Sequence, residues 1–249
     1  MKFSVITVCF NSQDTIAETI ESVLSQEDCQ LEYIVVDGNS TDDTNAVIEK
    51  YRDSIDVYIS EPDSGIYDAM NKGLARASGD IVCILNSDDR YSSRYSLKYV
   101  LDEFSKDSEL QLLFGDLNFL NFATSAVVRA CRYERFKPWM LRYGWMPPHP
   151  ASFVRRSVYK EFGPYKLDYQ ISSDYEMFVR WLMVHKARWK HIKSVLVDMR
   201  TGGASTSGLK SSYILNMEII KACKSNGIYT NIFMIMFKLP FKLFELVKK

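Results

Sequence analysis

The sequence predicts an α/β fold in which a mostly parallel, Rossmann-like sheet is flanked by helices, with a small antiparallel element and C-terminal helices. Two observations lead to this prediction. Short apolar runs rich in β-branched residues alternate, along the first third of the chain, with segments whose apolar residues recur at helical spacing. Strands separated by helices need crossover connections, and crossovers produce parallel pairing. At 249 residues the chain is also long enough to bury one large core.

The predicted elements follow in chain order. The strand-like runs are residues 3–9, 33–36, 55–60 and 81–85, and the helical segments between them are 12–25, 44–51 and 67–77. The later part of the chain is expected to contain a hairpin over 111–120 and 124–133, a surface or cleft-lining segment over 136–163, a helix over 174–185, a strand over 194–199 and two final helices. The surface assignment rests on four prolines within 136–163, because proline disrupts regular hydrogen bonding.

Composition narrows the possible partners and the compartment. Basic and acidic residues both number 31, and no basic-aromatic groove stands out, so nucleic acid is not expected as a partner. The five cysteines form no CxxC pair, which favours buried free thiols in a reducing compartment over disulfides or a zinc site. No leader-like start and no apolar run of about 18–20 residues is present, so a cytoplasmic location is expected.

The C-terminal residues 231–249 combine bulky apolar side chains with four lysines, Lys238, Lys242, Lys248 and Lys249. This composition suits a helix that lies in a membrane interface with its lysines toward anionic lipid. The alternative is an ordinary C-terminal helix that packs on the domain. The first interpretation places the protein peripherally on the inner face of the cell membrane.

Polar residues follow each of the first four predicted strands. They are Asn11, the pair Asp37 and Asn39, Asp63, and the pair Asp88 and Asp89. In open α/β sheets ligands bind outside the carboxyl ends of the strands, so these side chains are expected to converge on one ligand site. Turns favour Asp and Asn for local reasons as well, and a single one of these residues would be weak evidence.

The chemistry of these groups suits a nucleotide and a metal. Asp88 and Asp89 could bind Mg²⁺ or Mn²⁺ through carboxylate oxygens and leave positions open for a diphosphate. The alternative is a solvated turn in which Asp89 caps the next helix. Asp37 could accept a hydrogen bond from a nucleobase and Asn39 could contact the ribose. Neither GxGxxG after the first strand nor GxxxxGK[ST] occurs, which argues against a dinucleotide enzyme or a P-loop NTPase.

Asp174 is the candidate general base. It lies near the start of the predicted helix over 174–185, where the helix dipole favours an ionised carboxylate that can accept a proton. The alternative is that Asp174 is simply a favourable first-turn residue of that helix.

Five segments together resemble the family 2 glycosyltransferases with a GT-A fold, in the branch of bacterial polysaccharide and colanic-acid-type assembly. The segments are VITVCFN at 5–11, IVVDGNSTDDT at 34–44, SEPDSGIYDAMNKGLARASGD at 60–80, ILNSDD at 84–89 and HPASFVRRSVYKEFGPY…ISSDYEMFVRW between 149 and 181. They stand in the expected order and span about the first 205 residues, and the third and fifth are long and specific.

The resemblance implies a role for each matching residue. It implies that Asp37 contacts the nucleobase, that Asp88 is the metal-binding member of the DxD motif, with Asp89 beside it, and that Asp174 is the catalytic base of an inverting displacement. It also implies that Asp63 and Asn71 belong to the donor pocket. The predicted nucleotide-sugar site thus comprises Thr7, Asn11, Asp37, Asn39, Asp63, Asn71 and Asp88, and the predicted acceptor residues are His149, Arg180 and Gly203. The alternatives for His149 and Gly203 are a structural histidine and a plain turn. Two positions depart from the pattern: Asn86 replaces the first Asp of the DxD motif, and Ser173 replaces the Glu that usually precedes the base.

The expected activity is transfer of one sugar per encounter from a nucleotide diphosphate sugar, by default a UDP-sugar, to a saccharide acceptor that is expected to be lipid-linked. Only Val179-Arg180-Trp181 remains of the QxxRW motif of processive synthases. Residues 1–205 are expected to form the transferase domain, with 1–90 binding the nucleotide and 91–205 the acceptor, and 206–249 a helical extension. Two alternatives stay open: a nucleotide-sugar-binding protein without turnover, and a glycoside hydrolase with Asp88 and Asp174 as paired carboxylates.

Overall fold

The computed structural model describes residues 1–121, 124–200 and 209–237. Its internal contacts divide the chain into two compact units. The first unit comprises Met1–Glu134, Pro148–Tyr165 and Arg188–Thr201, and the second comprises Arg135–Pro147, Lys166–Ala187 and Gly202–Lys249. Each unit is described below by itself.

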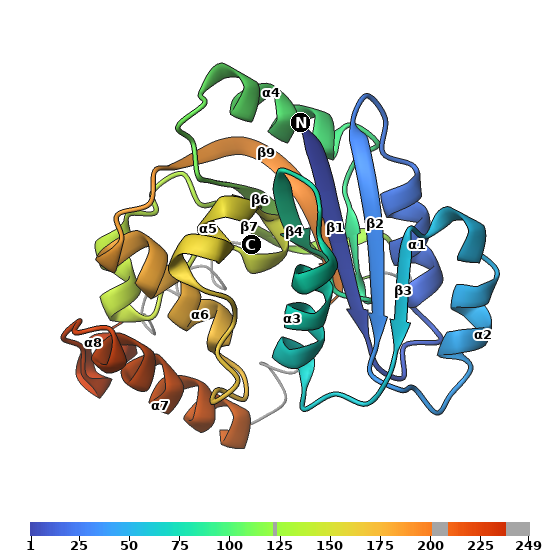
Figure 1. The fold of residues 1–249 in the computed structure, drawn as a ribbon. Helices are drawn as coiled ribbons and strands as arrows, with labels where there is room; N and C mark the ends of the chain where they lie inside the picture. The colour runs from blue at the N-terminus through green and yellow to red at the C-terminus, as the bar shows by residue number, and fades with distance from the viewer. Residues whose placement is uncertain (122–123, 201–208, 238–249) are drawn as a thin grey trace. The chain divides into compact units, whose positions relative to one another are not determined.

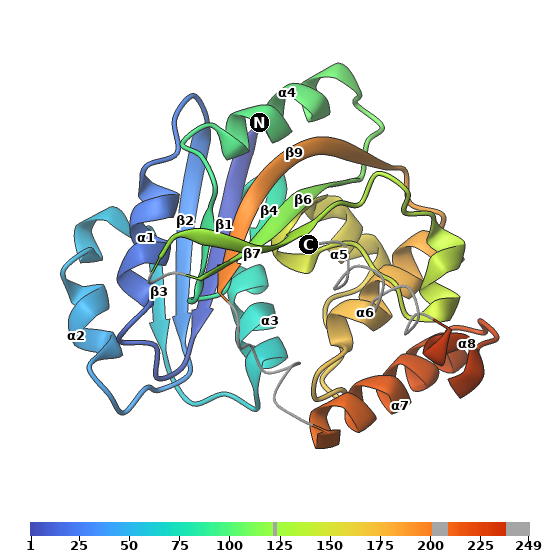
Figure 2. The same ribbon diagram turned by 180° about the vertical axis from the view of Figure 1, so that it is seen from behind.

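The first unit is built on one mixed sheet with the strand order β3-β2-β1-β4-β8-β6-β9-β5, and β7 pairs with β6 outside this path (Figures 1 and 2). The strands are β1 (Lys2–Cys9), β2 (Gln30–Asp37), β3 (Val57–Ser60), β4 (Ile81–Ile84), β5 (Asp89–Tyr91), β6 (Leu112–Asn121), β7 (Ala126–Cys131), β8 (Ser152–Arg155) and β9 (Trp189–Arg200). Strands β3, β2, β1 and β4 are parallel, as predicted from the alternating pattern. The predicted α/β fold class is confirmed.

Helices cover both faces of the parallel strands. They are α1 (Ile16–Leu24), α2 (Thr44–Glu49) and α3 (Ile66–Arg76), and the unit also contains α4 (Ser96–Lys106) and α5 (Arg156–Phe162). Side chains of a strand alternate between faces, so Val5 joins the core that contains Ile16 and Ile20 of α1, whereas Ile6 faces α3. Gly73 lets α3 approach closely, because a Cβ atom there would lie 2.4 Å from Cγ2 of Ile6.

Several predicted elements are confirmed with shifted ends. The hairpin is β6 and β7, which pair antiparallel, and the strand expected over 194–199 is the longer β9. The helix expected over 174–185 is α6 (Ser173–Phe178) continued by a π-helical turn over Val179–Val184. Cys9, Cys83 and Cys223 are buried free thiols, as expected, whereas Cys29 and Cys131 are only partly buried.

The expectation that residues 136–163 run over the surface or line a cleft is wrong for part of this segment. Ser152–Arg155 forms β8, an interior strand that pairs antiparallel with β4 and with β6. Phe153 is fully buried there. β8 is as short as β3 and β4, but it follows prolines at 147, 148 and 150, which favour irregular structure, whereas β3 and β4 alternate with segments of helical period.

The second unit is helical within the residues that the structure describes. It contains a 3₁₀ helix over Pro138–Tyr143, α6 with its π-helical continuation, α7 (Leu209–Ser225) and α8 (Ile232–Met236). The predicted final helices are thus present. Trp181 and Tyr175 are buried, and the Tyr175 hydroxyl donates to the carbonyl of Leu141, which ties α6 to the 3₁₀ helix. No helix in the described ranges is both long and apolar enough to cross a membrane.

Candidate functional site

The carboxyl ends of β1, β2 and β3 lie level with one another at one edge of the sheet. The parallel register pairs Cys9 with Asp37 and Asp37 with Ser60. Figure 1 shows the arrowheads of these strands at the same edge. The main chain continues this alignment past the strands, since Gly38 N donates to Cys9 O at 2.9 Å and Glu61 N to Asp37 O at 3.1 Å. The predicted convergence of the strand-end residues is therefore present for these three strands.

Asp37 is fully buried at the centre of this edge. Its Oδ2 accepts from Ser60 Oγ at 2.7 Å and from Ser40 N at 3.1 Å, and its Oδ1 accepts from the Ser40 hydroxyl. These bonds hold the turn after β2 against the end of β3. The predicted contact between Asp37 and a nucleobase stays a prediction, and the observed partners give Asp37 a structural role as well.

Asn11 and Asn39 shape the same edge through left-handed backbone conformations. Their φ angles are 49° and 64°, a region that Asn tolerates better than most residues. Asn11 N donates to Ser40 Oγ at 2.8 Å, and Asn11 Oδ1 accepts from Thr41 N at 2.9 Å. Both asparagines are exposed, so their side chains border the solvent where the sequence predicts a nucleotide.

Asp63 lies against the turn after β2. A Cβ atom on Gly38 would lie only 2.4 Å from Asp63 Oδ2, so this close approach requires glycine at position 38. The other carboxylate oxygen, Oδ1, accepts from Gly65 N at 2.8 Å. The structure thus brings together Asp37 and Asp63, which are separated in the sequence by α2, a 3₁₀ turn over Arg52–Ser54, β3 and the loops between them.

The turn that carries Asp88 connects β4 to β5 and is linked to the loop after β1. Ser12 Oγ and Ser87 Oγ are 2.8 Å apart, within hydrogen-bonding distance. Asp88 is half-buried. Burial raises the pKa of its carboxyl, and the nearby positive charge of Arg200 acts in the opposite direction. A half-buried carboxylate beside a cationic group is suited to a negatively charged ligand with a divalent cation.

Asp89 has a different environment from Asp88. It belongs to β5 and is 2% exposed, so the alternative of a solvated turn whose Asp89 caps the next helix is wrong; α4 begins only at Ser96. Its Oδ2 accepts from Asn86 Nδ2 at 3.1 Å, whereas Asp89 Oδ1 and Asn86 Oδ1 are buried and have no hydrogen-bond partner among the described residues. Burial, and then the charge of Asp88, raise the pKa of Asp89 well above its usual value.

Unpaired buried oxygens at this turn are the kind of group that a bound cation would satisfy. Asn86, Asp88 and Asp89 are oxygen donors of the class that Mg²⁺ and Mn²⁺ prefer, so the residues present fit the predicted metal. In the described part of the chain, no group of three or more His, Cys, Asp and Glu residues is arranged to hold a metal ion.

Three other predicted residues have well-defined surroundings in the first unit. Thr7 is buried inside the sheet, where Tyr33 Oη donates to its hydroxyl at 3.1 Å. Asn71 on α3 binds the main chain of Tyr165 twice, through Nδ2 to O at 2.8 Å and from N to Oδ1 at 3.1 Å. His149 Nε2 lies 2.8 Å from the Tyr165 hydroxyl. Their predicted roles in binding donor or acceptor stay predictions.

Asp174 and Arg180 belong to the second unit. Asp174 is the second residue of α6 and is half-buried, and its Oδ1 accepts from Tyr175 N at 2.8 Å. Arg180 Nη2 is 3.0 Å from Oε2 of Glu176, which is fully buried. Its predicted contact with the acceptor is untested and would have to coexist with this ion pair. Gly203 lies outside the described residues.

Some residues of the site were not predicted from the sequence. Ser12 and Ser87 join two loops, and Arg200 adds positive charge near Asp88. Arg200 could have been noted, because it directly follows the strand predicted over 194–199. The serines carry no such signal, since serine is common in any turn.

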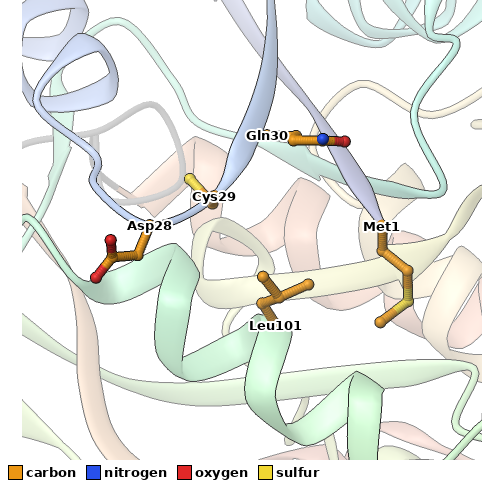
Figure 3. Close-up of a pocket in the computed structure, with 5 residues that line it drawn as sticks. All are labelled: Met1, Asp28, Cys29, Gln30 and Leu101. Carbon is orange, nitrogen blue, oxygen red and sulfur yellow. The ribbon is translucent and has the colours of Figure 1, made fainter.

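A surface hollow elsewhere on the first unit is not part of this site. It has a volume of about 420 Å³ and is lined by Met1, Asp28, Cys29, Gln30 and Leu101 (Figure 3). Met1 and Gln30 stand at the starts of β1 and β2, so the hollow lies at the end of these strands opposite to Asp37.

The chain matches the model of the glycosyl transferase family 2 over residues 4–163, which is more than half of its length. An uncharacterized glycosyltransferase of Mycobacterium tuberculosis is 34% identical over 208 residues, covering 82% of this chain and 76% of that protein. A PGL/p-HBAD biosynthesis glycosyltransferase of Mycobacterium bovis is 26% identical over 184 residues, covering 72% of this chain and 68% of that protein. The chain belongs to glycosyltransferase family 2.

Solved structures show the same fold at low sequence identity. The 1–349 portion of TarS from S. aureus in complex with UDP-GlcNAc superposes with a TM-score of 0.71 at 19% identity, covering 92% of this chain and 68% of that one. Glucosyl-3-phosphoglycerate synthase from Mycobacterium tuberculosis, in complex with Mn²⁺, UDP and phosphoglyceric acid, has a TM-score of 0.64 at 19% identity and covers 92% and 80% of the two chains. The GT-A-like fold that the resemblance implied is therefore confirmed.

The contact between Gly38 and Asp63 generates a first prediction. Gly38→Ala should displace the Asp63 carboxylate and weaken binding of a nucleotide diphosphate about tenfold, ~1.4 kcal/mol. Stability should change little, because the displaced atom is the end of a side chain. Isothermal titration calorimetry of wild type, Gly38→Ala, Asp63→Ala and the double variant measures this as a double-mutant cycle. Additive losses in the double variant would show that Gly38→Ala does not act through Asp63.

Proposed function

We propose that this chain is an inverting, non-processive glycosyltransferase that moves a sugar from a nucleotide diphosphate sugar, with UDP-sugars as the default donor class, to the hydroxyl of a saccharide acceptor. The observation that supports this proposal is the meeting of Asp37, Asn39 and Asp63 at one sheet edge, in a chain that belongs to family 2. A Rossmann-like sheet receives nucleotides at this edge. TarS with UDP-GlcNAc and the synthase with UDP are relatives in fold whose structures hold such ligands.

The cation proposal concerns Asp88, with Asp89 beside it. Asp88 would hold Mn²⁺ or Mg²⁺ together with the diphosphate of the donor, and the bound ion would neutralise charge on the departing nucleotide diphosphate. The half-buried Asp88 and the unpaired buried oxygens of Asn86 and Asp89 support this assignment. Asn86 in place of the first Asp of the DxD motif still offers a carbonyl oxygen. A mannosyltransferase from Pyrobaculum calidifontis with a TM-score of 0.65 contains GDP-Man and Mn²⁺.

The proposed reaction is one in-line displacement. Asp174 takes the proton of the acceptor hydroxyl while that oxygen forms a bond to the anomeric carbon, and the bond from this carbon to the diphosphate oxygen breaks. The nucleotide diphosphate leaves with the bonding electrons, and the configuration at the anomeric carbon inverts. Residues 1–90 would supply most of the donor site and residues 91–205 the acceptor site, with 206–249 as a helical extension.

The donor class can be measured first by thermal shift. We expect one of UDP, GDP, dTDP and CDP to stabilise the protein selectively and to need Mn²⁺; at about 100 times its Kd the gain is about 2.7 kcal/mol. Asp88→Asn should lose the metal-dependent part of this shift, whereas the matched variant Asp28→Asn, at the opposite end of the strands, should keep it. If no nucleotide stabilises the wild type with Mn²⁺, the proposed donor and metal site is wrong.

Asp174→Asn tests the base. It should lower turnover by about 10²–10⁴-fold, the usual contribution of general base catalysis, while nucleotide binding stays near wild type. Turnover is followed as nucleotide diphosphate release from UDP-GlcNAc, UDP-glucose and GDP-mannose with Mn²⁺. Wild-type turnover in Asp174→Asn would rule out Asp174 as the base. Donor binding without any release by the wild type, with these sugars and a range of saccharide acceptors, would instead support the alternative of a binding protein without turnover.

We further propose that the second unit contacts a membrane surface, which would place the enzyme near a lipid-linked acceptor. Phe233 is 80% exposed, and Trp139 and Phe237 are 58% and 59% exposed. The rings of Trp139 and Phe237 both contact Tyr143, with centroids 5.8 and 6.1 Å away, so these two exposed aromatics belong to one patch, and Phe233 lies one helical turn before Phe237. Arg135 and Lys137 are exposed nearby in sequence, and four lysines follow Phe237, which suits anionic lipid. Residues 238–249, within the segment predicted to bind membrane, lie outside the described residues.

Flotation with phosphatidylglycerol-containing vesicles measures this contact. The wild type should float, and Phe233→Ser with Phe237→Ser, or removal of residues 231–249, should reduce flotation several-fold. Tyr99→Ser, which removes an exposed ring from α4 of the first unit, is the matched control and should float like wild type. Equal flotation of all four proteins would contradict membrane binding through this patch.

A further inference from the structure

Glu218, on α7, accepts hydrogen bonds from three consecutive main-chain amides, those of residues 170–172, which lie shortly before the proposed base Asp174. Its Oε1 accepts from Gln170 N at 2.6 Å, and its Oε2 accepts from Ile171 N and Ser172 N, each at 2.9 Å. The next residues are Ser173, the first residue of α6, and Asp174. All of these groups belong to the second unit. One carboxylate thus fixes the chain up to two residues before Asp174.

The other side of Asp174 is held through Glu176, which lies on α6 itself. Glu176, two residues after the base, is fully buried and accepts from Asn226 Nδ2 at 3.0 Å, directly after α7. Glu176 also pairs with Lys166 Nζ at 2.7 Å and with Arg180. Ser173 Oγ donates to Lys166 O at 2.7 Å. Asp174 therefore lies between two anchored points, and its own Oδ1 accepts from the adjacent Tyr175 N.

The chemistry of Glu218 is specific to a carboxylate. Two oxygens with about four lone-pair sites can accept three N–H bonds at once, and bonds to an ionised acceptor are shorter and stronger than neutral ones. Glutamine has one acceptor oxygen and an NH₂ group that would face an N–H donor. An apolar residue would leave three amides, those of Ile171 and Ser172 being partly buried, without this partner. No other residue type of similar length can satisfy the segment 170–172 in the same way.

We propose that Glu218 is a positioning residue for catalysis: by binding the amides of 170–172 it sets the place of the Asp174 carboxylate. This inference rests on the proposed function, in which Asp174 is the base. General base catalysis depends on geometry at the level of about 0.5–1 Å, and a displacement of about 1 Å can cost about 10²-fold in rate. Fixing the main chain before the base supplies that precision without touching substrate.

The test compares Glu218→Gln and Glu218→Ala with a matched control on the same helix. The control is Lys221→Gln, which removes a bond from α7 to Asp168 O at 2.6 Å, upstream of the segment that Glu218 binds. Turnover of UDP-GlcNAc, UDP-glucose and GDP-mannose with Mn²⁺ is measured as nucleotide diphosphate release, and amide hydrogen exchange is measured at 170–172. We expect kcat to fall about 10- to 100-fold in both Glu218 variants, with KM for the donor within twofold of wild type and faster exchange at 170–172. Lys221→Gln should keep wild-type kcat.

Each outcome decides between the two levels of the proposal. The positioning role is overturned if Glu218→Gln keeps wild-type kcat although amide exchange at 170–172 becomes faster. It is also overturned if exchange at 170–172 does not change, or if Lys221→Gln loses as much kcat as the Glu218 variants. If Glu218→Ala fails to fold, Glu218→Gln still decides, since it keeps the size of the side chain. Asp174→Asn separates the causes: turnover by that variant refutes the proposed base itself, whereas its inactivity beside fully active Glu218 variants refutes only the role of Glu218.

Discussion

The hydrogen bonds of the buried Asp37 carboxylate are the interaction on which the candidate donor site depends. A carboxylate removed from water is costly unless hydrogen bonds replace the lost hydration, and Ser40 and Ser60 provide them. Because Ser40 in turn accepts from Asn11 N, the ends of β1, β2 and β3 are joined through one side chain. This junction holds the loops that carry the exposed Asn11 and Asn39, so the candidate ligand edge depends on the hydrogen bonds of one buried carboxylate.

Burial also separates the two adjacent carboxylates of the metal turn. Asp89 lies inside the sheet as the first residue of β5, where it pairs with Met199 of β9, and among the described residues only Asn86 donates to its carboxylate. Asp88 stays half-buried beside the charge of Arg200. Burial raises the pKa of both carboxyls, and for Asp89 the negative charge of Asp88 acts in the same direction. The two adjacent carboxylates therefore have different roles. Asp88 is accessible to a ligand from the solvent, whereas the buried Asp89 stabilises the turn.

The sequence predicted the parallel half of the sheet because short apolar runs alternate there with segments of helical period, and the rule for strand ends then pointed to Asp37, Asp63 and Asp88. β8 is as short as β3 and β4, but it follows three prolines, and its pairing with β4 and β6 depends on strands distant in sequence. The burial of Asp89 depends on β9 in the same way. Glu218 could not be found from the sequence at all, since its partners are main-chain amides, which every residue carries.

The buried surroundings of Ser173 explain why this chain has serine, and not glutamate, directly before Asp174. Ser173 is fully buried and its hydroxyl donates to Lys166 O, so this position has room and a partner for a small donor. A glutamate here, as in the usual family pair, would bring a further carboxylate next to Glu176, which already takes Lys166 and Arg180 as its cations. Two buried carboxylates competing for the same cations repel each other. Serine at 173 is therefore what this packing requires, and the carboxylates that support Asp174 come instead from Glu176 and from Glu218 on α7.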